Sequence, residues 1–298
     1  SQPFWDYQAR NAYILRQGKP SIDLCLYLGE NAPVKILTHL LPDIPGGFDF
    51  DAFTSYALFN RMDEANGKIV LPDGVSYNMM LMPHNSNITF DALKKIADLV
   101  KRGIKIYGAK PIHSMSGRDT GKEAEYTRIA DELWGKEPAA EGYNKCGKGT
   151  VYWGMPLAEA INMAAIIQDI EMKNGNTKDD MIYFAHRKLA DGDIYFLDNH
   201  KNIAEEDLFT FASAGKYAQL WNTVTGERFA LPVAKRNENT TAVELYFSPR
   251  ESYFVVITDK EEQLPVVKWY KPVSAEAITG NWNVYFDEKL GGPGNYCV

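Results

Sequence analysis

The clearest alternation of apolar and polar residues along this chain lies between Val75 and Gly108. Tyr77 to Met82 is a short apolar run, which predicts a strand buried on both faces. Thr89 can cap the helix that follows, its apolar stripe ends at Gly103, and Ile104 to Tyr107 predicts a second strand. Strand, helix and strand within about 35 residues make one βαβ unit. The pattern therefore predicts a Rossmann-like α/β core.

Three segments before this unit have patterns of their own. Residues 4–17 carry apolar side chains at helical spacing, and Gly18 ends that predicted helix. Ser21 to Leu28 is rich in strand formers and predicts the first strand of the sheet, and Phe48 to Arg61 predicts a second helix. The proline-containing link from Asn31 to Asp49 lies just past the carboxyl end of that strand, the edge at which ligands gather in open α/β sheets.

Beyond Gly108 helix and strand patterns alternate once more. The spacing of apolar residues then changes to that of short strands alone. Glu123 to Trp134 and Pro156 to Ala165 predict helices, with a strand at Gly147 to Gly154 between them. The charged and polar residues 169–180 predict a linker. The short strands after the linker are separated by turn signals, as is typical of an antiparallel β-sandwich. These predicted strands are Ile182 to Phe184, Asp193 to Asp198, Leu208 to Ala212, Ala218 to Trp221, Thr241 to Phe247 and Ser252 to Ile257.

We therefore predict four segments. Residues 1–18 form a connecting helix and residues 19–168 an α/β domain of Rossmann or flavodoxin type. Residues 180–262 form the antiparallel β-sandwich. In residues 263–298 the apolar positions alternate again, as at the start of a further β domain that is cut short.

Composition and charge exclude several classes of protein. A net charge of −7 and a pI near 5.4 argue against nucleic acid as a partner, because that affinity depends on Lys and Arg neutralising phosphates. No stretch approaches the ~20 apolar residues of a membrane span, and the N-terminus lacks the pattern of a signal peptide. The three cysteines are widely spaced without a CxxC, so they indicate neither a zinc site nor a disulfide framework. Cys25 is predicted to pack as a small buried hydrophobe.

The loops at the expected ligand edge contain few groups for chemistry. A cysteine amidotransferase would place its nucleophile after Tyr77 to Met82, but the residues there are Pro83, His84 and Asn85. The first strand is not followed by GxGxxG, which disfavours a dinucleotide site. The histidines show no HxH or HExxH spacing, so we expect neither a metal nor a cofactor.

Four residues in these loops are candidates for contact with a ligand. They lie in loops expected near the carboxyl edge of the sheet: His39, Asp43, His84 and His113. Solvated or capping roles are the simpler interpretation of each. Asp49 and Asp51 belong to the same stretch as Asp43 and serve equally well as helix-start residues.

Several longer motifs resemble one known family. They are WDYQARNAYILRQGKPSIDLCLYLGE from Trp5, LPDGVSYNMMLMP from Leu71, ADLVKRGIKIYGAKP from Ala97, ADELWG from Ala130, GKGTVYWG from Gly147 and HRKLADGDIYFLDN from His186. In this order they resemble the region after the catalytic barrel in family-106 glycoside hydrolases, which are bacterial enzymes of the α-L-rhamnosidase type. The closing GNWNVYFDEKLGGP resembles the beginning of the next β-sandwich in that family.

The resemblance implies an accessory role. In the family the catalytic carboxylates belong to the barrel, so no catalytic residue is expected here. The α/β part resembles the amidotransferase-like domain that also follows the barrel in some β-galactosidases, where it provides support and subunit contact. The implied partners are an upstream barrel of the same parent chain and that parent's carbohydrate substrate, and a homo-oligomer is left open. The implied location is periplasmic or extracellular.

Three hypotheses follow for the function. The first is a non-catalytic segment of a carbohydrate-degrading hydrolase, inactive in isolation. The second is a carbohydrate-binding module, and the third is a self-contained α/β hydrolytic enzyme. The first hypothesis predicts that the helix from Trp5 to Gln17 presents an apolar surface that the barrel would cover.

Overall fold

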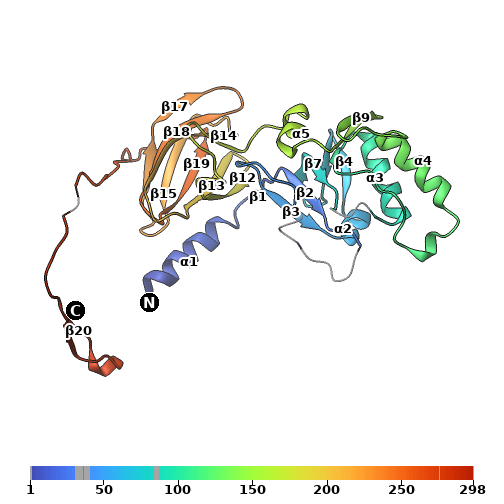
Figure 1. The fold of residues 1–298 in the computed structure, drawn as a ribbon. Coiled ribbons are helices and arrows are strands. Elements are labelled where there is room, and N and C mark those ends of the chain that lie inside the picture. The colour runs from blue at the N-terminus through green and yellow to red at the C-terminus, as the bar shows by residue number, and fades with distance from the viewer. Residues whose placement is uncertain (1, 31–35, 37–40, 84–86, 275, 298) are drawn as a thin grey trace. The chain divides into compact units, whose positions relative to one another are not determined.

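The computed structural model describes residues 2–30, 36, 41–83, 87–274 and 276–297. The chain forms two compact units, residues 1–267 and residues 268–298. Within the larger unit we distinguish two regions. The α/β region comprises residues 22–168, and the two-sheet region comprises residues 2–21 together with residues 169–267 (Figure 1).

The α/β region is built on a six-stranded sheet with the strand order β3-β2-β7-β8-β10-β9. Neighbouring strands run parallel, except that β9 is antiparallel to β10. The strands are β2 (Leu24–Tyr27), β3 (Phe50–Phe53), β7 (Met79–Leu81), β8 (Lys105–Tyr107), β9 (Gly142–Cys146) and β10 (Gly149–Trp153). The predicted βαβ unit is confirmed, because β7 and β8 are parallel neighbours joined through a helix.

Helices pack on both faces of this sheet, α3 (Phe90–Arg102) and α4 (Glu123–Trp134) in one apolar cluster and α5 (Leu157–Met163) in another. Side chains alternate across a strand, so Tyr27 joins the first cluster and Leu26 the second. All four residues of β2 are buried. This burial on both faces explains why the strand is continuously apolar in the sequence.

The predicted ends of α3 are confirmed. The hydroxyl of Thr89 accepts a hydrogen bond from the Ala92 amide at 3.3 Å. Gly103 follows the helix with φ of 148°, a conformation that favours glycine. The side chains of the helix that face the sheet, among them Leu93 and Ile96, are fully buried. Local capping and the apolar stripe thus agree with the packing.

The helix predicted from Phe48 to Arg61 is wrong in its first half. Residues Phe50–Phe53 form strand β3, and only Ser55–Asn60 form a helix, α2. β3 pairs in parallel with β2, and Asp51 accepts a hydrogen bond from the Tyr77 hydroxyl at 2.8 Å. Pairing with the sheet therefore overrides the local pattern. A small antiparallel sheet follows, formed by β4 (Asp63–Ala65), β5 (Lys68–Val70) and β6 (Ser76–Tyr77).

The two-sheet region contains two antiparallel sheets, with strand orders β1-β12-β13-β19-β15-β16 and β11-β14-β18-β17. The rings of Tyr195 in β13 and Phe211 in β14 lie 4.6 Å apart, so aromatic side chains of the two sheets pack together. The first sheet comprises β1 (Lys19–Pro20), β12 (Ile182–Lys188), β13 (Gly192–Asn199), β15 (Tyr217–Asn222), β16 (Arg228–Leu231) and β19 (Ser252–Thr258). The second comprises β11 (Ile170–Met172), β14 (Glu205–Phe211), β17 (Val233–Arg236) and β18 (Thr241–Phe247).

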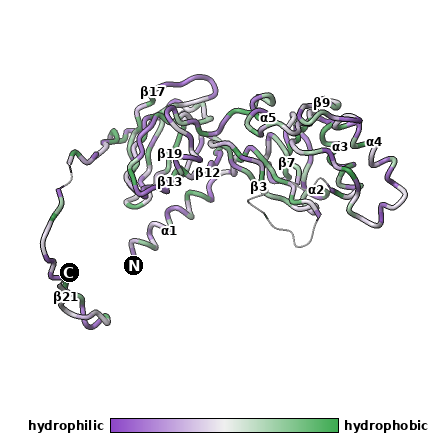
Figure 2. Tube along the Cα trace, viewed as in Figure 1, coloured by the Kyte–Doolittle hydropathy of each residue, from purple (hydrophilic) through white to green (hydrophobic). Residues whose placement is uncertain are grey.

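The chain's first helix, α1 (Gln2–Ile14), belongs to the two-sheet region by its contacts. The Arg10 guanidinium donates to the backbone oxygens of Thr223 and Val224 at 3.0 and 2.6 Å. Ile14 and Leu15 pack against a small apolar cluster of the first sheet. Figure 2 shows that α1 is largely hydrophilic, whereas all residues of β2 and β19 are buried. The helix is therefore attached along one side only.

The smaller unit, residues 268–298, contains a short antiparallel pair, β20 (Asn283–Tyr285) and β21 (Asn295–Cys297). A single 3-10 turn, Glu288–Leu290, lies between the two strands. Over the part of the chain that the structure describes, no helix combines the length and apolarity needed to cross a membrane.

Candidate functional site

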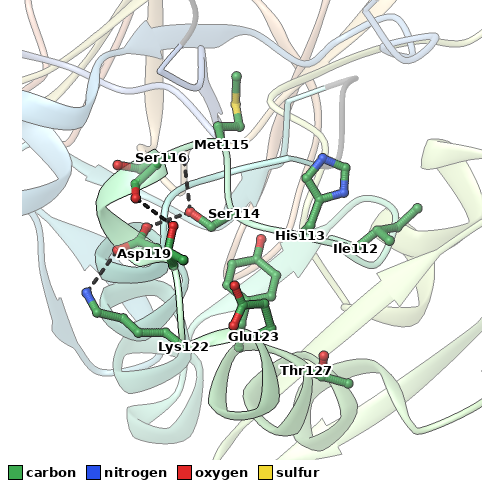
Figure 3. A pocket seen from close by; sticks show the side chains of 12 residues that line it. Ile112, His113, Ser114, Met115, Ser116, Asp119, Lys122, Glu123 and Thr127 are labelled. Carbon is green, nitrogen blue, oxygen red and sulfur yellow. Dashed lines mark hydrogen bonds and ion pairs between the residues drawn. The ribbon is translucent and has the colours of Figure 1, made fainter.

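A pocket of about 280 Å³ lies between the loop after β8 and the start of α4. Figure 3 shows His113 and Ile112 on one side of it, Ser114 and Asp119 on another, and side chains of α4 below. His113 was predicted from the sequence as a ligand-loop residue, and its side chain lines this pocket. The pocket is the structure's counterpart of the expected ligand edge, because it follows the carboxyl end of a parallel strand.

The polar groups of this pocket are organised around Asp119. Its carboxylate accepts hydrogen bonds from the Ser114 hydroxyl at 2.5 Å, the Lys122 ammonium at 2.9 Å and the Phe90 amide at 3.0 Å. The bonds from Ser114, Lys122 and Phe90 lower the pKa of Asp119 to about 2. Asp119 is therefore a fixed anion at the N-terminus of α3, where the helix dipole also favours negative charge.

A second carboxylate closes the same helix end. The Glu30 carboxylate accepts hydrogen bonds from the Thr89 amide at 2.8 Å and from the Thr89 hydroxyl at 3.0 Å. The same hydroxyl accepts a hydrogen bond from the Ala92 amide. The amides of Thr89, Phe90 and Ala92 are thus all bonded to side chains of this chain. Amides at a helix N-terminus commonly bind a phosphate or an oxyanion. Here they already have anionic and hydroxyl partners.

The four predicted ligand-loop residues do not come together in one described cavity. His39 and His84 lie outside the described residues. Asp43 forms an ion pair with Lys178 and lines a different cavity, of about 400 Å³, together with Pro45 and Gln168. His113 lines the pocket of Figure 3. The assignment of these residues to a ligand therefore stays a prediction.

An open cleft of about 620 Å³ is lined by both regions of the larger unit. The α/β region contributes Asp23, Asn78 and Lys105, which lie at the amino ends of its strands. The two-sheet region contributes polar and charged residues that include Asp169, His186, Lys188, Asp193 and Ser213. The pattern of the sequence did not single out this place.

His186 is held between two carboxylates on the wall of this cleft. Its Nδ1 lies 2.8 and 3.0 Å from the two carboxylate oxygens of Asp169, and its Nε2 lies 2.9 Å from Asp193. The side chain is only 2% exposed, and its ring stacks on that of Tyr195 at 4.0 Å. Since both ring nitrogens face carboxylates, both must donate, and the ring is an imidazolium. Burial lowers the pKa of His186, but the hydrogen bonds to Asp169 and Asp193 outweigh it and raise the pKa to about 9.

The two carboxylates have further donors. Asp193 accepts the Ser213 hydroxyl at 2.5 Å, and Asp169 accepts the Tyr195 hydroxyl at 3.3 Å. Burial raises the pKa of Asp193, but the bonds from His186 and Ser213 outweigh this effect and lower it. Ser213 bonds to Asp193 and not to the imidazole, so the residues do not form the serine–histidine relay of a hydrolase.

Asp23 borders this group from the α/β region. One of its oxygens accepts the Asn78 amide at 2.8 Å, while the other is buried and has no hydrogen-bond partner among the described residues. Burial, followed by the charge of Asp169, raises the pKa of Asp23 to about 7. One signal in the sequence could have suggested part of the group. His186 and Asp193 lie on paired strands, and residue 186 faces residue 195, which makes them diagonal neighbours.

Metal binding has no geometric support in this part of the chain. Among the described residues, no group of three or more His, Cys, Asp and Glu side chains is arranged to hold a metal ion. In the cleft, the ring nitrogens of His186 are already directed at carboxylates.

Comparison with known proteins gives a consistent family relationship. The model of glycoside hydrolase family 106, described as alpha-L-rhamnosidase, matches residues 1–233. A protein of Formosa agariphila named "Putative beta-glucuronidase" is 30% identical over 264 residues, which are 87% of this chain and 21% of that protein. The chain thus spans about a fifth of the length of this curated relative.

One solved structure agrees with this relationship, and another is similar in fold. The rhamnosidase from Novosphingobium sp. PP1Y superposes with a TM-score of 0.81 at 26% identity, covering 99% of this chain and 28% of the rhamnosidase. A family-42 beta-galactosidase from G. stearothermophilus superposes with a TM-score of 0.51 at 11% identity, covering 84% of this chain and 42% of that enzyme. The second likeness concerns the fold alone.

Proposed function

Because this chain belongs to glycoside hydrolase family 106, the family of the alpha-L-rhamnosidases, we propose that it is a non-catalytic accessory segment of such a hydrolase. Its role is to support a catalytic barrel that precedes it in a longer parent chain. The match to 28% of a solved rhamnosidase is consistent with one segment of a larger enzyme. The carbohydrate substrate then belongs to the parent, as does a periplasmic or extracellular location.

The proposal includes a finer description of the fold. The α/β region is a Rossmann or flavodoxin-like domain of the amidotransferase-like type, and the two-sheet region is a β-sandwich. The parallel order β3-β2-β7-β8-β10 and the aromatic contacts between the two antiparallel sheets support this description. The likeness in fold to a family-42 beta-galactosidase supports it as well.

The outer side of α1 is the observation that carries the proposal. The stripe Trp5, Ala9, Ala12, Tyr13 and Arg16 is exposed along its whole length. Trp5 and Tyr13 are each 64% exposed. The opposite side holds the helix to the two-sheet region through Arg10, Ile14 and Leu15. A helix anchored on one side, with large aromatic rings on the other, is suited to contact a further surface.

The N-terminus of α3 supports the non-catalytic part of the proposal. A nucleophile or oxyanion site would be expected where β7 leads into α3. The Asp119 and Glu30 carboxylates bond to the first amides of that helix, and Asp119 is kept ionised by its donors. An oxyanion placed there would meet two negative charges. The geometry favours a structural use of this edge.

A direct assay tests whether the segment is catalytic. The purified polypeptide should release no nitrophenol from 4-nitrophenyl α-L-rhamnoside above the buffer rate, while far-UV circular dichroism verifies that it is folded. Release that scales with protein concentration would overturn the proposal. Binding of oligosaccharides by the folded polypeptide alone would favour a carbohydrate-binding module instead.

A binding experiment tests the proposed contact of α1. Calorimetric titration of this polypeptide with the separately produced barrel of the parent should give measurable binding. The double substitution Trp5→Ala and Tyr13→Ala should weaken the affinity at least about tenfold, because truncating buried aromatic anchors typically costs more than 1 kcal/mol each. Tyr143→Ala, which removes an exposed tyrosine of β9, is the matched control and should leave the affinity unchanged. Equal binding by the double variant would contradict the assignment of α1.

A further inference from the structure

The chain crosses between its two regions at residues 21–23 and again at residues 164–170. Each crossing segment forms a hydrogen bond with His186. In the first, the Ser21 amide donates to the backbone oxygen of His186 at 3.0 Å, and Asp23 follows two residues later. In the second, the Asp169 carboxylate accepts a hydrogen bond from Nδ1 of the His186 ring. Each passage thus contributes one aspartate to the surroundings of the same imidazole.

The backbone of Asp169 connects the two regions as well. Its amide donates to the Gly47 oxygen in the α/β region at 3.0 Å, and its oxygen accepts the Ala212 amide in the two-sheet region at 3.0 Å. A shift of the Asp169 side chain would therefore disturb hydrogen bonds on both sides. Asp169 therefore contacts both regions through its backbone and the His186 ring through its side chain.

Asp23, Asp169, His186 and Asp193 together carry a net charge of minus one while Asp23 is protonated. Asp169 and Asp193 are negative and His186 is positive. Ionised Asp23 would raise the excess to two, although one of its carboxyl oxygens is buried and has no hydrogen-bond partner among the described residues. Loss of the His186 proton would instead leave two carboxylates facing a neutral ring.

The surrounding lysines offset this excess only in part. Several groups from neighbouring elements act on one or more of Asp23, Asp169, His186 and Asp193. They are Asp49, Lys68, Asn78, Lys188, Tyr195 and Ser213. Lys68 and Lys188 are exposed at the cleft. Their charges are screened by water more than those within the buried group.

We propose that Asp23, Asp169, His186 and Asp193 form a proton-dependent joint between the α/β region and the two-sheet region. The joint is closed while Asp23 and His186 hold their protons. It loosens as these protons are released toward alkaline pH, and the two regions then separate locally at residues 21–23 and 169–170.

The sign of the pH effect follows from the two pKa shifts. The pKa of Asp23 is raised from 3.8 to about 7, so its stabilising contribution is complete below about pH 4 and is lost as the pH rises through 7. The pKa of His186 is raised from 6.5 to about 9, so its contribution is complete below 6.5 and is lost as the pH rises through 9. Both effects loosen the joint in the same direction.

Hydrogen exchange at the joint tests the proposal. The amides of Ser21, Asp169 and Ala212, whose hydrogen bonds adjoin the joint, should lose protection between pH 6 and 8.5 after correction for intrinsic exchange. Proton linkage through Asp23 alone predicts a loss of about tenfold over this interval. In Asp23→Asn, which cannot ionise, the loss should be about tenfold smaller than in the wild type. Asp43→Asn, an exposed aspartate of the same region, is the matched control and should behave as the wild type.

A second measurement needs no substitution. With ¹⁵N-labelled histidine rings, the His186 nitrogens should both carry a proton at pH 7, and their shifts should change with a midpoint near pH 9. A neutral His186 ring at pH 7 would overturn the proposal. Protection factors at the three amides that do not change between pH 6 and 8.5, or that change equally in Asp23→Asn and the wild type, would also overturn it.

Discussion

The pKa of an aspartate is shifted in opposite directions at the two ends of the parallel sheet. Asp119, beyond the carboxyl end of β8, accepts three hydrogen bonds, and its pKa is lowered to about 2. Asp23, at the amino end of β2, accepts one side-chain bond, and its pKa is raised to about 7. Asp119 is nevertheless the less exposed of the two residues. Burial, followed by the charge of Asp169, raises the pKa of Asp23, whereas three hydrogen-bond donors lower the pKa of Asp119.

The largest effect is expected at the amino end of the sheet. His186→Ala removes the imidazolium that is hydrogen-bonded to both Asp169 and Asp193 and should lower the free energy of unfolding by about 3–5 kcal/mol near neutral pH. Urea unfolding followed by tryptophan fluorescence measures this change. His113→Ala, at the exposed pocket of the opposite end, is the control and should change it by less than about 0.5 kcal/mol. Similar losses for both variants would remove the distinction between the two ends.

An intermediate effect is expected from Asp119. Asp119→Ala leaves the Phe90 amide without its acceptor and should lower the free energy of unfolding by about 1–2 kcal/mol at pH 7. The pKa of Asp119 is depressed, so its contribution is present above about pH 4 and is lost as the pH falls toward 2. The difference from the wild type should therefore shrink between pH 4 and pH 3 in urea titrations. A constant difference across this range would mean that the side chain does not act as an ionised cap.

A smaller effect is expected from the neutral cap of the same helix. Thr89→Ala removes the acceptor of the Ala92 amide, and a loss of about 1 kcal/mol in the free energy of unfolding is typical for such a cap. Thr89→Ser keeps the hydroxyl and should restore most of that stability. Thermal unfolding of the two variants side by side measures the difference. Equal melting temperatures would show that Glu30 and Asp119 hold the helix end without the hydroxyl.

The smallest effect is expected at the surface pair of Asp43 and Lys178. The Asp43 side chain is 89% exposed, and such pairs contribute between 0 and about 1 kcal/mol. Asp43→Asn should change the free energy of unfolding by less than about 0.5 kcal/mol, and 0.5 M salt should abolish the difference. A loss that persists in salt would assign Asp43 a role beyond this ion pair.

The sequence predicts the elements whose local and long-range preferences agree. The cap at Thr89, the apolar stripe of α3, the Gly103 stop and the extent of α4 are all found as expected. Cys25 is buried among apolar residues, also as expected. Strands β12, β13, β15, β18 and β19 lie where the turn signals placed them.

The failures occur where contacts distant in sequence decide the structure. β3 is helical by its local pattern and becomes a strand through its pairing with β2. Residues 169–180 are polar and predict a linker, yet Ile170–Met172 pairs with β14 as β11. Asp23, Asp169 and His186 of the joint interact in the structure although they lie far apart in the sequence. No spacing of motifs indicates that they meet. His186 and Asp193 lie on strands that follow one another in sequence, but Asp23 and Asp169 become recognisable only when the tertiary contacts are known.

The pairing of β1 with β12 has a consequence for the order in which the chain folds. Lys19 lies opposite Lys188, so the whole α/β region is a loop whose two ends must meet before this edge of the sheet can form. An unfolded loop of that length resists closure because its ends explore a large volume. A folded α/β region holds the ends near one another and removes most of that resistance. The first sheet of the two-sheet region is therefore expected to gain its β1 edge late, after the inserted region has become compact.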